Sequence, residues 1–272
     1  MKPTLIALAL LTCLFSCNSR HNTSATTPPK KNDPAIAAND TGLLELPWLA
    51  RSAGGLYLAD QVIAVPPYGL EKIKLLVSRV PHDPKRDDYG STDSLSQRMY
   101  KSLSFREKFT YNMIHPDSYS QICHLGPFQT DHAHRIFGTL PDVFGEYDWS
   151  SRQLAFFNDH RDSVIALMKD LIKKEGRVGE NFKQVIIVLN ATELIPLLTD
   201  AARKETKDHN NLTVLILLMK ENDYPEYINS SFDQKLKGEP IDGRPPFLVY
   251  NKANEDLIIQ QANNFYQGLR AK

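Results

Sequence analysis

The sequence predicts a mainly helical fold in which antiparallel helices stack on one another behind a non-globular N-terminal segment. Three observations lead to this prediction. Apolar residues recur every three or four positions from Leu70 onward, and two serines are each followed three residues later by Glu or Gln, as in a capping box. In contrast, residues 18–42 contain no aromatic residue and a single branched aliphatic one, Ile36. An α/β arrangement is the alternative.

The first seventeen residues, MKPTLIALALLTCLFSC, have the pattern of an export signal. Lys2 supplies a positive charge, and an apolar run follows from Leu5 to Phe15. This run is far shorter than the ~20 apolar residues that span a bilayer. We therefore expect residues 1–16 to be a signal peptide that is removed, and not a stable transmembrane helix.

The end of this leader, Leu14-Phe15-Ser16-Cys17, resembles the lipobox of bacterial lipoproteins, although Phe15 departs from the usual small or aliphatic residue. The resemblance implies cleavage before Cys17 and a diacylglyceryl group on its sulfur, which makes a membrane the first expected partner. Two or three acyl chains anchor a protein essentially permanently. No acidic cluster follows Cys17, so we expect a lipid-anchored protein of the bacterial cell envelope, in the outer membrane and facing the periplasm.

Residues 17–42 are expected to form a flexible tether, because so few apolar side chains cannot offset the entropy of ordering. Such a tether reaches roughly 25–30 Å as a root-mean-square distance. About 230 residues remain to fold, which is enough to bury a substantial core without staples. We divide them into a mostly helical N-terminal region, 43–145, and a helical C-terminal region, 146–272.

The first expected helices lie in the N-terminal region. Apolar residues at helical spacing predict a helix over 70–80, which Pro81 stops. Ser104 and Glu107 then have the spacing of a capping box. The helix that starts there is expected to end before Pro116.

The clearest helical pattern extends over residues 151–175. Ser150 and Gln153 form a second capping-box pair at its start, and Gly176 suits a left-handed C-cap at its end. Its apolar positions are spaced by threes and fours, although Arg161 interrupts them. We expect one long helix here.

A closing amphipathic helix is expected at the C-terminus. Asn254 precedes two acidic residues, which favour a helix N-terminus. The apolar stripe of this helix is expected to comprise Ile258, Ala262, Phe265 and Leu269.

Two apolar runs, 184–189 and 212–219, are ambiguous between helix and strand. They are β-branched enough to be buried parallel strands, and a helix over 193–204 between them would complete a βαβ unit. However, each run lies within a longer segment that is compatible with a helix. The stretch from 190 to 222 resembles the helix pairs of HEAT-like repeats, with Pro196 in a first helical turn, where a missing amide is tolerated. This resemblance favours stacked helices.

The stretch HPDSYSQICHLGPFQTDHAH, residues 115–134, concentrates the side chains that could carry chemistry. Histidine, thiolate and carboxylate are ligands of zinc. The candidate metal ligands are His115, Cys123, His124, Asp131, His132 and His134, with Asp117 nearby. Their spacing fits no known ligand pattern, so the favoured interpretation is histidines beside a core cysteine. Cys123 is the one thiol that remains if Cys13 leaves with the leader and Cys17 is acylated.

No catalytic motif is present elsewhere in the chain: GxSxG, HExxH, GxGxxG, GxxxxGK[ST] and an EF-hand loop are all missing. Lys plus Arg balance Asp plus Glu at 32 each, and a neutral chain without a basic block gives no reason to expect nucleic acid as a partner. We therefore expect a non-catalytic envelope lipoprotein without a cofactor, which binds a protein or envelope component through a helical surface. The alternatives are a metal-dependent envelope hydrolase that uses residues 115–134, and a periplasmic immunity or inhibitor lipoprotein.

Overall fold

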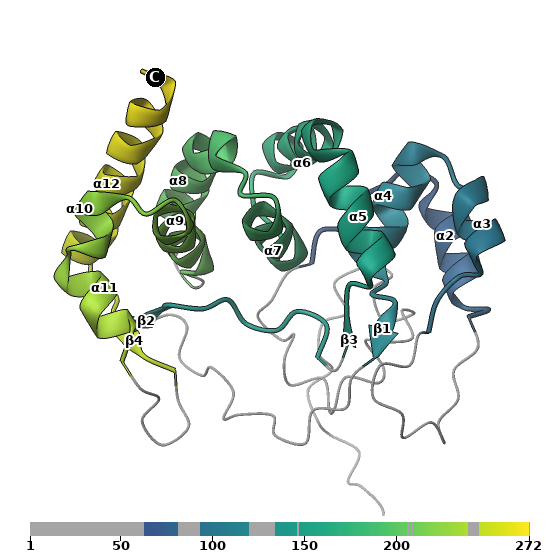
Figure 1. Cartoon of the computed structure of the whole chain (residues 1–272), viewed down its shortest axis with the longest axis horizontal. Coiled ribbons are helices and arrows are strands. Elements are labelled where there is room, and N and C mark those ends of the chain that lie inside the picture. Colours follow the sequence, from purple (N-terminus) through teal and green to yellow (C-terminus); the bar gives the residue numbers. More distant parts are fainter. Residues whose placement is uncertain are drawn as a thin grey trace, which may run out of the picture. The chain divides into compact units, whose positions relative to one another are not determined.

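The computed structural model confirms that the fold is mainly helical, with 64% of the described residues in helices (Figure 1). All described residues belong to one unit, 42–272. The structure describes residues 63–80, 93–119, 134–145, 147–205, 207, 209–238 and 245–271. The predicted signal peptide and tether lie outside these ranges. No described helix is both long enough and apolar enough to cross a membrane.

The predicted N-terminal helices are confirmed. Helix α2 (Leu70–Val77) buries Ile73 and Val77 and packs against α4 (Phe105–Ile114). The capping box of α4 is complete, because the Ser104 side chain accepts from the Glu107 amide and the Glu107 carboxylate accepts from the Ser104 amide. A short helix that the sequence did not indicate, α3 (Gln97–Ser102), precedes α4.

The prediction of one helix over 151–175 is wrong, because the chain breaks at His160. Two helices, α5 (Ser151–Asp159) and α6 (Arg161–Glu175), meet there, and His160 has φ −121° and ψ 28°. The His160 ring packs against Phe105 and Phe156, with centroids 5.4 and 5.1 Å away. The break directs Arg161, whose charge interrupted the apolar pattern, out of the core. The predicted cap at Gly176 is confirmed, with φ 72°.

The ambiguous runs are helical, so the α/β alternative is wrong. Residues 184–189 lie in α7 (Glu180–Val188) and its C-cap, and residues 212–219 lie in α9 (Asn210–Glu221). Between them, a 3-10 turn η4 (Thr192–Leu194) leads into α8 (Ile195–Lys204), which has Pro196 in its first turn as expected.

The surroundings of α9 explain why its sequence resembles a strand. Helices α7, α8 and α12 (Lys252–Arg270) all pack against α9 (Figure 1). Side chains on every side of α9 are therefore buried, among them Leu212, Val214, Leu215 and Leu218. A helix enclosed in this way is apolar all round, and its periodicity disappears. The short connection and the contact between α8 and α9 make them an antiparallel pair, while membership of the HEAT-like repeats stays a prediction.

The C-terminal helix starts earlier than predicted. Asn251, and not Asn254, is the N-cap of α12, and its side chain accepts from the Asn254 amide at 2.9 Å. Two short helices precede it, α10 (Pro225–Ile228) and α11 (Ser231–Leu236). Of the predicted stripe, Ile258, Ala262 and Phe265 are buried and Leu269 is exposed.

Two antiparallel strand pairs, which the sequence did not indicate, lie along the helices. Strand β1 (Ser118–Tyr119) pairs with β3 (Tyr147–Asp148), and β2 (Arg135–Phe137) pairs with β4 (Phe247–Val249). Both pairs are too short to show alternation. The Thr213 hydroxyl donates to the Phe137 carbonyl at 2.9 Å, which fixes β2 to α9.

Candidate functional site

Two of the six candidate metal ligands lie within the described residues. His115 is the C-cap of α4 and is buried, with its Nε2 2.6 Å from the Asp93 carbonyl oxygen. His134 is exposed just before β2, and its carbonyl accepts from the Tyr250 amide at 2.8 Å. The candidates Cys123, His124, Asp131 and His132 lie outside the described part of the chain, as does the lipidation site Cys17. The described residues alone contain no group of three or more His, Cys, Asp or Glu that could hold a metal ion. The metal hypothesis therefore stays a prediction.

Next to His115, Asp117 is the centre of a buried polar network. Its side chain is 1% exposed and accepts from three donors. Arg152 Nε lies 2.7 Å and Ser150 Oγ 3.1 Å from Oδ2, and the Tyr111 hydroxyl donates to Oδ1. The Gln153 amide oxygen accepts from the Asp117 backbone amide at 2.9 Å. Side chains from α4 and α5 therefore hold the chain just before β1 in place.

The same network extends to the segment before α3. The Asp93 amide donates to the Asp117 carbonyl at 2.9 Å, and the Tyr147 hydroxyl donates to the Asp93 carboxylate at 3.0 Å. Arg152 Nη1 donates to the Leu95 carbonyl at 2.8 Å. Three segments far apart in the sequence are joined by hydrogen bonds that are shielded from water, where their energies are largest.

The ionisation of this network is fixed by burial and by the Asp117 charge. Burial first, and then the neighbouring carboxylate, raise the pKa of Tyr111 far above its usual value. Burial lowers the pKa of Arg152, but its hydrogen bond and attraction to Asp117 outweigh that effect, so the net pKa is raised. Tyr111 therefore stays a neutral donor and Arg152 a cation at every physiological pH. The two side chains therefore act as a stable hydrogen-bonded cross-link to Asp117.

A second buried polar cluster connects α7 with α9. The Lys183 ammonium donates to the Glu180 carboxylate, and these side chains are 1% and 2% exposed. The Asn210 side chain donates to the other Glu180 oxygen at 3.1 Å. Glu180 also lies in the first turn of α7, where a negative charge is favourable. The cluster thus links the first turns of two core helices.

The turns that connect successive helices are tied together at the surface. Arg161 forms a bidentate pair with Glu193, at 2.7 and 2.9 Å, and also donates to the carbonyls of Leu189 and Asn190. Asn190 in turn exchanges two side-chain hydrogen bonds with Asn222, at 3.1 and 2.7 Å. Three alternate turns, those between α5 and α6, between α7 and α8 and after α9, are therefore joined by side-chain hydrogen bonds.

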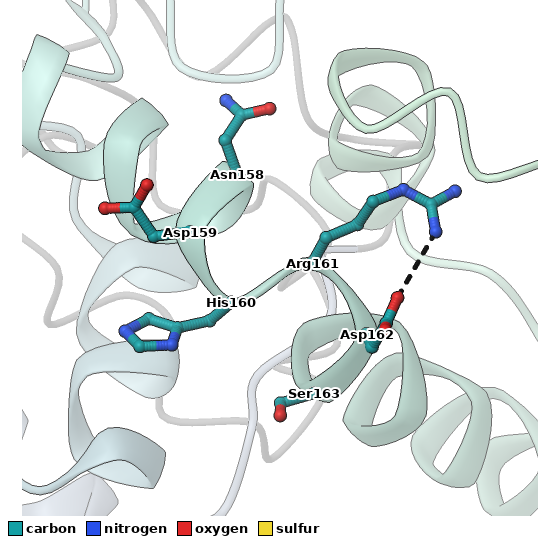
Figure 2. Close-up of a pocket in the computed structure, with 6 residues that line it drawn as sticks. All are labelled: Asn158, Asp159, His160, Arg161, Asp162 and Ser163. Atoms are coloured by element: carbon teal, nitrogen blue, oxygen red, sulfur yellow. Dashed lines mark ion pairs between the residues drawn. The ribbon is translucent and has the colours of Figure 1, made fainter.

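A polar recess opens where α5 and α6 meet (Figure 2). Figure 2 shows Arg161 pointing away from His160 and toward Asp162, with which it forms a 3.5 Å ion pair. The recess is lined only by the consecutive residues 158–163. Within the described part of the chain, a single stretch of sequence lines the recess, so its position rests on the α5–α6 junction alone.

No family model, curated protein or solved structure matches this chain. Arguments about function therefore depend on its own residues.

The residues that sequence reasoning missed are the partners in the two buried clusters. Arg152 shows no motif and meets Asp117 only when the chain folds. Tyr111 and Lys183 have partners nearby in the sequence, Asp117 and Glu180, but the burial of these pairs depends on how the helices pack. One signal was available for Lys183, because Glu180 lies three residues before it, which is the spacing of an ion pair along a helix.

Proposed function

We propose that this chain is a lipid-anchored, non-catalytic protein of the bacterial cell envelope, placed in the outer membrane facing the periplasm, whose helical body binds a protein partner. The observation that carries the proposal is the leader that ends in Leu14-Phe15-Ser16-Cys17. The acyl chains on Cys17 hold the protein at the membrane, and residues up to 42 connect them to the helical unit.

The buried polar side chains support a binding role rather than catalysis. Catalytic groups require perturbed pKa values together with access to a substrate. Asp117 and Glu180 are buried and bonded to neighbouring helices, so they stabilise the fold. A stack of helix pairs, in contrast, presents an extended surface that suits protein binding.

The lipid anchor is tested by Cys17→Ser. The unchanged protein is expected in the outer-membrane fraction, with a mature N-terminus at Cys17 that carries acyl chains, as measured by mass spectrometry. The variant is expected to leave the membrane pellet almost entirely, because its sulfur no longer carries the lipid. Cys123→Ser is the matched control and should remain in the pellet. Retention of Cys17→Ser in the outer membrane at the level of the unchanged protein would falsify the proposal.

The outward side of α12 is the part of the helical body that best suits a protein partner. Residues 257–269 of α12 contain no charged side chain. Leu257 and Leu269 are 42% and 38% exposed. The solvent-facing side of an amphipathic helix commonly carries charged or polar side chains, whereas interface cores are depleted of charge.

A photo-crosslinking residue at Gln260 tests this surface in living cells. We expect one discrete crosslinked species that contains a single envelope protein, identified by mass spectrometry, and at least a severalfold loss of it when Leu257→Glu is added. The same probe at Asp170, which is exposed on α6, is the control. The same species from both positions, or none from Gln260, would contradict a partner at α12. The identity of the crosslinked protein would also show whether the alternative, an immunity or inhibitor role, applies.

A further inference from the structure

Positive charge is concentrated in the first three described helices. Residues 70–79 and 96–108 contain seven Lys and Arg but only two Glu, and no Asp, while the whole chain is neutral. No single run of the sequence is strongly basic, so this concentration arises from several short segments. The three helices that carry it lie next to one another in Figure 1.

Contacts of α4 with α2 and with α3 bring three of these charges near one another, and Arg98 and Lys101 flank Tyr100 in α3. Lys72 of α2 pairs with Glu107 of α4 at 2.8 Å, and the Arg106 guanidinium lies 4.9 Å from the centroid of the Tyr68 ring, just before α2. Lys108 lies over the ring of Tyr100 in α3, 5.6 Å from its centroid. We call this group the basic surface, and it consists of Lys72, Arg98, Lys101, Arg106 and Lys108.

Most of this charge is not neutralised within the described residues. Glu107 is committed to Lys72 and to its capping box, and these hydrogen bonds lower its pKa. Among the described ion pairs, none involves Arg98, Lys101 or Arg106, and all three are exposed. The basic surface is therefore available to an anionic partner.

Apolar side chains are exposed among these charges. Met99, between Arg98 and Lys101, is 38% exposed, and Leu75 on the solvent side of α2 is 52% exposed. Basic residues interleaved with exposed apolar ones are typical of surfaces that lie in a membrane interface, where the cations contact phosphates and the apolar groups enter the headgroup boundary.

We infer that the basic surface binds the anionic phospholipid headgroups of the membrane to which the protein is anchored. The choice of a membrane over another polyanion rests on the proposed anchor at Cys17, since the acyl chains would keep the helical unit close to that surface. Binding through α2–α4 would leave α12, at the other end of the helix order, to a protein partner.

The test uses the lipid-free mature chain, 17–272 with Cys17→Ser, because residues 42–272 form one unit with its own core. Its co-sedimentation is measured with two kinds of vesicles. One contains phosphatidylcholine alone, and the other contains in addition about 30–40% phosphatidylglycerol, which makes its surface anionic. We expect binding to the anionic vesicles only. Raising the salt to about 0.5 M should weaken it severalfold, because the charges are screened.

Arg98→Glu with Lys101→Glu is expected to reduce the affinity for anionic vesicles by about 10- to 30-fold, since each cation near such a surface contributes roughly fivefold. Lys173→Glu with Lys174→Glu is the matched control, because this pair is also exposed on a helix and changes the net charge equally. Circular dichroism spectra should be the same for both variants. Equal losses from the two pairs, or no binding by the unchanged chain, would overturn the inference. Because no acyl chain is involved, neither result depends on the test of Cys17.

Discussion

Asp117→Ala is expected to lower the free energy of unfolding by about 3–5 kcal/mol, because it removes one partner of a buried ion pair. The carboxylate accepts from Tyr111, Ser150 and Arg152 at once. Without it, the buried Tyr111 hydroxyl and the partly buried Ser150 and Arg152 lose their acceptor, and each group that water cannot reach costs free energy. The cost should appear in urea denaturation followed by circular dichroism at neutral pH.

A milder change and an exposed control make this prediction specific. Asp117→Asn keeps one oxygen acceptor and should cost less than Asp117→Ala, while still folding well enough to measure. Asp159→Ala, at an exposed position of α5, should shift the free energy by no more than about 0.5 kcal/mol. If Asp117→Ala stayed within about 1 kcal/mol of that control, the network would not have the structural role assigned to it.

Lys183→Met is expected to destabilise the protein by about 3 kcal/mol or more, since it leaves the Glu180 charge buried without its lysine partner. The double variant Glu180→Gln with Lys183→Met should recover most of this loss, because a buried pair that is replaced as a whole costs little. Thermal and urea unfolding of Lys183→Met, of Glu180→Gln and of the double variant measure the coupling energy between the two side chains. Simple additivity of the two single costs would argue against a direct pair.

The loss in Lys183→Met should depend on pH in a defined direction. Removal of the Lys183 charge raises the pKa of the buried Glu180 carboxyl relative to that in the unchanged protein, because its nearest cation is lost. The folded variant then takes up a proton at a higher pH than the unchanged protein does, so the loss of stability relative to the unchanged protein should become smaller as the pH falls toward the unfolded pKa of about 4.3. A loss that is constant between pH 7 and pH 5 would instead indicate a packing defect.

The helical prediction succeeded where one face of a helix is buried and the other is exposed. Both capping boxes, the start of α2 and the cap at Gly176 follow from local backbone chemistry, which the sequence displays directly. The prediction was ambiguous for 212–219 because α9 is enclosed by other helices. The prediction was wrong at His160, where the helix breaks although no local signal indicates a break. The His160 ring packs against Phe105, which is distant in the sequence.

The candidate site could be predicted only in part. The sequence drew attention to His115 and Asp117, but it grouped them with nearby histidines because they are close in the chain. In the folded unit, His115 meets Asp93 and Asp117 meets Arg152, partners 22 and 35 residues away. Side-chain chemistry can be recognised in a sequence, whereas the pairing of side chains depends on how the helices pack.

What the sequence alone determined is the local part: a lipobox-like leader, helix starts and stops, and a mainly helical class, because each depends on residues within a few positions of one another. Only the tertiary structure decided that lysines and arginines from three helices lie near one another, and that Asp117 is paired with Arg152. Those properties arise from contacts between segments that are distant in the chain, and such contacts cannot be inferred from the local sequence pattern.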